Sequence, residues 1–134
     1  MKIHGKKTVV TLDGDSLTTH SNNSTLEVTS DSHDLTTYGK NAHVFGGGLL
    51  NGTSTISGFY DSTAMTGPRA IIRPLIGTVV ELIYQPEGVG SGLPQEKVDV
   101  LVTKYTQTAP VAEYVTWSVD LQFSDDADYT PQAP

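Results

Sequence analysis

The chain has 134 residues, which predicts one domain spanning residues 1–134, and it contains no cysteine, which excludes disulfides, thiolate nucleophiles and cysteine-based zinc sites. Its formal net charge of -7 argues against direct binding to nucleic-acid phosphates, which needs clustered lysine and arginine. Eighteen Thr and 13 Val indicate a β protein, and no apolar segment approaches the length of a membrane span, so we expect no membrane partner.

The N-terminal part of the chain predicts short antiparallel strands after an N-terminal arm of residues 1–6. Residues 7–12 and 16–19 flank Asp13-Gly14-Asp15, and Asp-Gly between β-type runs is a strong hairpin signal. Asn22-Asn23 predicts a second turn, and residues 24–29 follow it as another strand.

Residues 31–52 are polar and glycine-rich, with Gly46-Gly47-Gly48 at their centre. They predict an inter-strand loop that is long for so small a domain, and such loops are usually functional or disordered. A strand over residues 51–60 is expected to follow.

A short helix is predicted next, with Thr66 as candidate cap and Pro68 in the first turn. Apolar residues recur four positions apart between residues 71 and 76, and Gly77 is a natural terminator. Pro74 removes one helical hydrogen bond, so the helix should be short, kinked or partly irregular.

The C-terminal half predicts strands over residues 78–84, 97–105 and 115–123, with a loop over residues 85–95. The last strand has the clearest pattern, because Val115, Trp117, Val119, Leu121 and Phe123 alternate with polar residues and so share one buried face. The acidic tail, residues 125–134, is expected to be loose and flexible.

Together these elements predict a mainly β fold. We expect an antiparallel β-sandwich or barrel of about seven strands, with one short flanking α-helix and a long inter-strand loop.

The sequence offers little catalytic or metal-binding chemistry. His4, His20, His33 and His43 have no spacing that would put two ligands on one helix or strand face, so solvated or hydrogen-bonded loop histidines are favoured. The glycine-rich segment over residues 88–92 lacks the Gly-Lys-Ser/Thr of a phosphate loop and the glycine spacing of a nucleophile elbow. We expect no catalytic residue, no metal and no cofactor.

Three further residues have a functional and a structural interpretation. Glu81 and Asp99 each interrupt an apolar strand and could form an acid–base pair, but a sheet face that meets water or a partner subunit is favoured. Trp117 could be a ligand platform, but its position on an apolar strand face favours core packing.

Three stretches carry motifs that can be compared with known families. Asp34-Leu35-Thr36-Thr37-Tyr38-Gly39 fits the pattern Asp-x-Thr-Ser/Thr-aromatic-Gly, residues 48–61 end in Gly-x-Tyr-Asp, and residues 109–123 place a Pro-Val turn before an alternating strand. In these three stretches the chain resembles the major tail tube proteins of long-tailed (siphovirus-like) bacteriophages. The order of elements from residue 7 to residue 124 also matches, without an added immunoglobulin-like domain.

The resemblance implies a non-enzymatic structural virion protein. Six copies would close into a ring by joining their sheets into an inner barrel, and rings would stack into a tube through which DNA passes without specific binding. Other partners would be tail proteins such as the tape measure, terminator and distal tail proteins. The protein would be made in the host bacterial cytoplasm and end in the phage tail.

Within this scheme, the long loop would reach a neighbouring subunit or ring. The predicted subunit or ring contacts are Tyr38, Gly39, Val44, Phe45, Leu49 and Leu50. Lumen-facing candidates come from the polar faces of the strands: Thr53, Thr55, Ser57 and Glu81. The acidic balance of the chain would suit a lumen along which DNA slides.

Three alternatives remain open from the sequence. A head decoration or head–tail connector protein would also be a virion component, but it would lie elsewhere in the particle. A soluble β-sandwich binding module for a glycan or peptide would need a preformed groove with exposed aromatics, and only 7% of the chain is aromatic. An enzyme is the weakest alternative.

Overall fold

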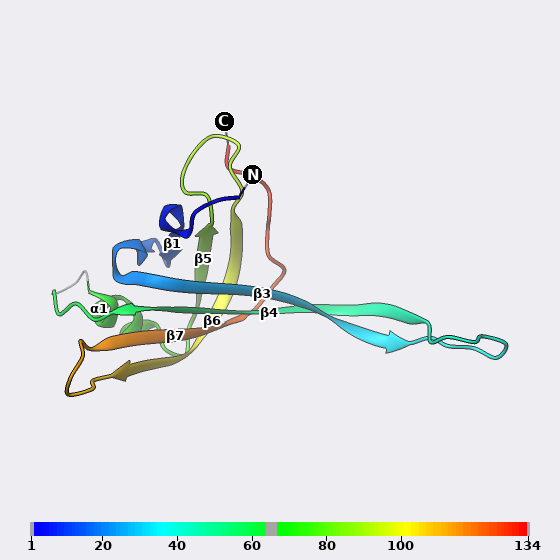
Figure 1. The fold of residues 1–134 in the computed structure, drawn as a ribbon. Helices are drawn as coiled ribbons and strands as arrows, with labels where there is room; N and C mark the ends of the chain where they lie inside the picture. The colour runs from blue at the N-terminus through cyan, green and yellow to red at the C-terminus, as the bar shows by residue number, and fades with distance from the viewer. Residues whose placement is uncertain (1, 64–66, 134) are drawn as a thin grey trace.

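The computed structural model describes residues 2–63 and 67–133 and contains, in that part of the chain, seven strands and one short α-helix. The strands are β1 (Val9–Leu12), β2 (Asp15–Ser16), β3 (Ser21–Asp34), β4 (Phe45–Phe59), β5 (Val79–Gln85), β6 (Glu96–Thr108) and β7 (Thr116–Phe123). They form one antiparallel sheet in the order β2-β1-β5-β6-β7-β4-β3 (Figure 1). The predicted mainly β fold of about seven antiparallel strands with one short helix is confirmed.

The single sheet folds over at β6. The first half of β6 pairs with β5 and its second half pairs with β7, and a register shift lies between Val102 and Lys104. In Figure 1, β5 runs across the direction of β3, β4 and β7, so the two limbs of the sheet lie one over the other. Ser24 on β3 donates a hydrogen bond to the hydroxyl of Tyr84 on β5, 3.3 Å away, which ties the limbs together. Irregularities of this kind bend a strand and let one sheet enclose its own core.

The core lies between the two limbs and consists of the alternate side chains that the strand patterns predict. Trp117, Val119 and Leu121 on β7 are buried, as are Val98, Val100 and Val102 on β6. The other buried hydrophobic side chains come from β1, β4, β5, the helix and the turn after β2: Val10, Leu12, Leu17, Ile56, Ile71, Ile72 and Leu82. Burial of Trp117 confirms core packing over the alternative of a ligand platform.

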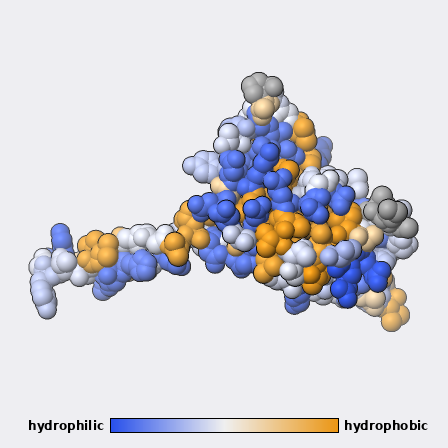
Figure 2. All heavy atoms as spheres, turned by 180° about the vertical axis from the view of Figure 1, so that it is seen from behind, coloured by the Kyte–Doolittle hydropathy of each residue, from blue (hydrophilic) through white to orange (hydrophobic). Residues whose placement is uncertain are grey.

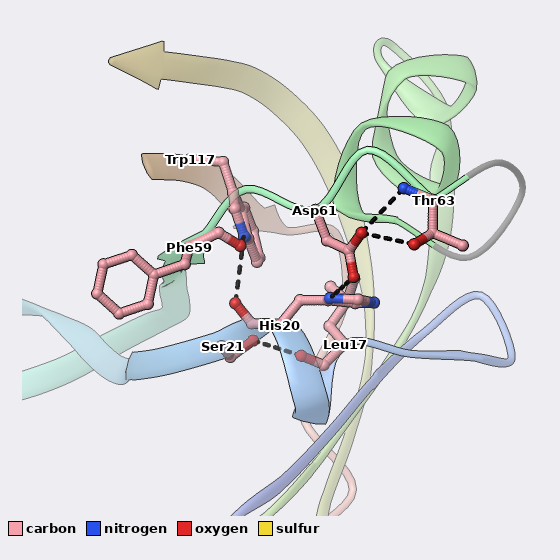
Figure 3. A network of polar contacts seen from close by, with 7 residues as sticks. All are labelled: Leu17, His20, Ser21, Phe59, Asp61, Thr63 and Trp117. Atoms are coloured by element: carbon pink, nitrogen blue, oxygen red, sulfur yellow. Dashed lines mark hydrogen bonds and ion pairs between the residues drawn. The ribbon is translucent and has the colours of Figure 1, made fainter. Parts of the chain in front are cut away.

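A polar network closes one end of the core (Figure 3). The indole Nε1 of Trp117 donates to the carbonyl oxygens of His20, at 3.2 Å, and Phe59, at 3.1 Å. Ser21 Oγ donates to the Leu17 carbonyl oxygen at 2.6 Å. Gly58 allows this close approach, because a Cβ there would lie 1.8 Å from the His20 carbonyl oxygen.

The first predicted hairpin is confirmed, and the second predicted turn is wrong. Leu12 pairs with Asp15 across a two-residue turn in which Asp13 and Gly14 have φ of 51° and 80°, as Asp-Gly hairpin turns require. The segment at Asn22-Asn23 is not a turn but lies inside β3, where the register with β4 shifts between Ser21 and Asn23. A bulge accommodates one extra polar residue without reversing the chain.

The helix is short and irregular, as predicted. Helix α1 (Pro68–Ile72) passes directly into a 3-10 turn, η3 (Arg73–Leu75), at Pro74, and Gly77 follows with a φ of +82°. Gly67 occupies the cap position. The expected cap Thr66 lies outside the described residues. Among the described residues, no helix is long and apolar enough to cross a membrane.

The predicted loop over residues 31–52 is for the most part strand. Residues 31–34 belong to β3 and residues 45–52 to β4, so only residues 35–44 connect them. Gly46 and Gly48, which suggested a loop, leave room for side chains of the opposite segment. A Cβ at Gly48 would lie 2.6 Å from His33 Nε2, and one at Gly46 would lie 2.6 Å from Leu35 Cδ1.

The tail is hydrogen-bonded to the body, in contrast to the expectation of a loose segment. Asp128 and Lys97 exchange two backbone hydrogen bonds of 2.7 and 2.9 Å. Gln132 bonds through its backbone to Gly92 and Leu93, and through its side chain to Gly88 and Gly90. Residues 88–92 are therefore a loop held by the tail.

Candidate assembly surfaces

The outer parts of β3 and β4 project from the body as a hairpin arm, which we define as residues 30–50 (Figure 1). The six predicted contact residues, Tyr38, Gly39, Val44, Phe45, Leu49 and Leu50, all lie on the arm and are all exposed. Tyr38 is fully exposed and Leu49 is 81% exposed. Hydrophobic side chains are visible along the arm in Figure 2. Large apolar groups on a segment without its own core are typical of a partner surface.

The tip of the arm is held by internal hydrogen bonds. Asp34 Oδ1 accepts from the backbone N–H of Thr36, at 2.9 Å, and from its hydroxyl, at 2.5 Å. The Thr36 hydroxyl oxygen accepts from the Val44 N–H at 2.9 Å, and His43 lies 3.5 Å from the other Asp34 oxygen. The bonds from Thr36 hold the pKa of Asp34 below its usual range. The tip is thus a preformed turn.

The same Asp-x-Thr turn recurs twice and was missed by the sequence analysis. Asp61 accepts from the backbone and hydroxyl of Thr63, and Asp128 accepts from the backbone of Thr130. In each case hydrogen bonds from the threonine lower the pKa of the aspartate. The spacing itself is the signal, since a short acceptor two residues before a threonine favours such a turn.

An apolar groove of about 270 Å³ lies at the base of the arm. We call it the base groove. Its apolar lining is Val28, Leu50, Phe123, Ala127 and Tyr129, and its acidic lining is Glu96, Asp125 and Asp126. The pKa of Glu96 is raised, first by partial burial and then by the neighbouring Asp128 carboxylate. The groove therefore combines uncovered apolar surface with unneutralised negative charge.

The opposite end of the same strands carries a second apolar surface. Phe59, Tyr60, Tyr114 and Val115 line a shallow depression where β4 ends and β7 begins, and we call it the far-end patch. Phe59 and Tyr114 are exposed. Helix α1, which carries Arg69, lies at this same end of the molecule (Figure 1). Burial raises the pKa of Tyr105 most, Tyr60 adds to the rise and the Arg69 guanidinium opposes it.

The outward face of β3, β4 and β7 is polar. Thr53, Thr55 and Ser57 pair with Gln122, Asp120 and Ser118 on β7 and with Glu27, Thr25 and Asn23 on β3. Three of the four lumen candidates are therefore brought together. Glu81 is not among them, because it lies on the β5 limb beyond the bend, opposite Asp99 and exposed like it.

The body of the sheet contains a four-stranded layer whose two outer edges have no partner among the described residues. One is the outer edge of β3, whose other edge pairs with β4 over most of its 14 residues. The other is the part of β6 beyond residue 102, because β5 pairing ends at Leu101 while β7 pairing continues to Thr108. The two edges flank a four-stranded layer, β6-β7-β4-β3. Unpaired edges of this length are templates for pairing with another chain.

The histidines occupy separate polar positions. His4 caps the N-terminal 3-10 turn, with Nδ1 accepting from the Lys6 N–H, and His20 lies 3.8 Å from Asp61 (Figure 3). Within residues 2–63 and 67–133, no three His, Asp or Glu side chains come together in a way that could hold a metal ion.

The sequence matches no protein-family model and no curated protein. Solved structures are similar over nearly the whole chain. A chain of a native gene transfer agent virion has a TM-score of 0.80 at 11% identity, covering 96% of this chain and 99% of that one. A chain of the tail of an empty gene transfer agent particle, solved with C6 symmetry, has a TM-score of 0.79 at 15% identity and the same coverage. The SPP1 tail tube has a TM-score of 0.79 at 10% identity, covering 99% of this chain and 81% of that one. At these identities the likeness establishes the fold alone, which this chain shares with the SPP1 tail tube.

Proposed function

We propose that this chain is a non-enzymatic structural subunit of a phage-type tail tube, which self-associates into six-membered rings that stack. The observation that carries the proposal is the likeness, over 96–99% of this chain, to chains of a gene transfer agent virion, of a gene transfer agent tail and of the SPP1 tail tube. The open edges and projecting arm support it, because a monomer would leave both unsatisfied.

Ring closure would use the two unpaired edges. The β3 edge of one copy would pair with residues 103–108 of β6 in the next, which extends the four-stranded layer around the ring. Edge-to-edge addition gives main-chain hydrogen bonds to both strands and removes the exposed edges. The contact joins two different surfaces, so a fixed rotation repeats it until the ring closes.

The polar face of this layer would line the lumen. Thr53, Thr55 and Ser57 lie in its centre, next to Asp120, whose Oδ1 accepts from the Thr55 hydroxyl at 3.3 Å. The face carries small hydroxyl and acidic side chains, and its Lys104 is paired directly opposite Asp120, so it presents no cluster of cations to phosphates and DNA would slide past without specific binding. Glu81 is left out of this lining, because it lies on the other limb of the folded sheet.

The arm would make the contacts between subunits or rings. Tyr38, Phe45 and Leu49 are the proposed anchors, with Gly39, Val44 and Leu50 beside them, since these exposed residues have no core in their own chain. Further partners would be the tape measure, terminator and distal tail proteins, and the assembled protein would reside in a virion tail after synthesis in the host cytoplasm.

Negative-stain electron microscopy of the purified protein across a concentration series tests the proposal. Hollow tubes or stacked six-fold rings are expected, with sedimentation velocity following the loss of monomer. A protein that stays monomeric at every concentration, and also when mixed with preformed tail tips that would initiate a tube, contradicts the proposal.

A further inference from the structure

Exposed apolar side chains gather at the two ends of β3, β4 and β7. Of the 14 large hydrophobic side chains exposed among the described residues, eight lie on the arm or in the base groove: Val28, Leu35, Tyr38, Val44, Phe45, Leu49, Leu50 and Tyr129. Phe59 and Tyr114 lie in the far-end patch, and Val111 lies in the connection between β6 and β7. A surface that only meets solvent would scatter such groups singly, so this clustering indicates two contact surfaces.

The base groove is lined by acidic side chains, and the far end presents two arginines that could face them. The base groove carries Glu96, Asp125 and Asp126 on its lining. Arg69, at the same end of the molecule as the far-end patch, and Arg73, one helical turn later, are exposed and form no ion pair with any described residue. The acids at the far end are Asp61, which is already engaged by Thr63 and His20, and the exposed Glu113 next to Tyr114.

We propose that the base groove of one copy receives the far-end patch of the next copy along the tube, head to tail. This inference rests on the proposed tail tube function and assigns its ring-to-ring contact. Tyr114 and Phe59 would enter the groove beside Phe123 and Val28, while Arg69 and Arg73 meet Asp125 and Asp126. Such a contact joins two different surfaces without closing on itself, so it repeats indefinitely along one axis.

The positions of the two surfaces on the strands fit this repeat. On β4, Leu50 lies in the base groove and Phe59 in the far-end patch, and β7 runs antiparallel to β4 from Thr116, paired with Phe59, to Phe123 beside the groove. A shift of one body length along the strands therefore brings a groove onto a patch. The arm begins at the groove and points away from the body (Figure 1), so it would continue past the junction along the neighbour.

Charge reversal tests this contact. The double variants D125R/D126R and R69D/R73D should each form rings that no longer stack, because like charges then face each other across the junction. Combining all four changes in one chain restores complementarity and should restore tubes. D15R/E87R is the matched control, since neither residue lies in the groove or the patch. Circular dichroism and the fluorescence of Trp117 verify that every variant is folded.

Apolar contact and salt provide independent tests. Tyr114→Ser should shorten tubes, whereas Val89→Ser, a change at an exposed position in a distant loop, should not. Raising the ionic strength from about 0.1 M to about 1 M shortens the Debye length from about 10 Å to about 3 Å and should weaken stacking in the wild type.

The outcomes separate this inference from the proposed function. Wild-type tubes together with charge-reversed variants that stack normally overturn the head-to-tail contact and leave the tube function intact. A four-residue variant that stacks no better than the two doubles also overturns it. A wild-type protein that forms neither rings nor tubes refutes the tube function and this contact together.

Discussion

The indole N–H of Trp117, on β7, points at the carbonyl oxygen of His20, 3.2 Å away and 97 positions earlier in the chain. The same N–H also donates to Phe59 on β4 (Figure 3). One side chain thus ties three segments at the end of the core, where the first 3-10 turn after β2, the end of β4 and the start of β7 meet. This junction also positions the far-end patch, because Phe59 belongs to both.

Replacing Trp117 by Ala should destabilise the protein strongly. The change removes the largest buried side chain and two hydrogen bonds, and large aromatic truncations in cores cost about 3–5 kcal/mol of unfolding free energy. Trp117→Phe, which keeps most of the ring, should cost about 1–3 kcal/mol for the lost hydrogen bonds. Urea unfolding followed by circular dichroism measures both. If the alanine variant lost less than about 1 kcal/mol of unfolding free energy, Trp117 would behave as a surface residue and the core assignment would be contradicted.

The two like charges of Glu81 and Asp99 face each other directly across β5 and β6. Directly opposed like charges destabilise a sheet, so Asp99→Asn should stabilise the monomer by about 0.2–1 kcal/mol. Because both residues lie outside the proposed lumen layer, tube formation should be unchanged. Asp120→Asn makes the same change inside that layer and serves as the comparison for tube formation. If the Asp99 variant lost tubes and the Asp120 variant kept them, the assignment of the lumen to the layer of β6, β7, β4 and β3 would be wrong.

Local sequence signals predicted the parts of the fold that local chemistry determines. The Asp13-Gly14 turn needs two residues with positive φ, and those residue types supply them. The alternation around Trp117 follows from the pleat of a strand, whatever the strand packs against. Pro74 ends α1 where its missing N–H would be needed.

Signals that depend on distant partners could not be interpreted from the sequence. The glycines of the arm are typical of a loop in sequence, but in the structure the side chains of His33 on β3 and Leu35 just beyond it fill the space beside Gly48 and Gly46. The tail is polar and acidic, and its sequence does not reveal that Gln132 hydrogen-bonds to loop backbone groups at Gly88 and Gly90. The candidate contacts on the arm were predicted from exposed apolar groups alone, whereas the base groove needs residues from β3, β4, β6, β7 and the tail to converge.

The arm tip should respond to acid. The folded pKa of Asp34 is lowered by the Thr36 hydrogen bonds, so its carboxylate supports the turn above the ordinary aspartate pKa of about 3.9, and this support is lost as the pH falls through the lowered value. Thr36→Val should move the Asp34 midpoint up toward the ordinary value, whereas Thr36→Ser keeps the hydroxyl and should leave it low. Carbon-detected NMR titration measures the midpoint. Equal midpoints in the valine variant and the wild type would contradict the role of the hydroxyl.

Phe45→Asp should prevent assembly without unfolding the monomer. Phe45 is 62% exposed on the arm and stacks only on His43, with ring centroids 5.9 Å apart, so the core loses nothing. A carboxylate at a proposed anchor would have to be desolvated in the contact, and that cost opposes association. Size-exclusion chromatography and electron microscopy should find a monomer with wild-type circular dichroism. Val89→Asp places the same charge on an exposed loop away from the arm and should still form tubes. Normal tubes from the Phe45 variant would remove this part of the arm from the interface.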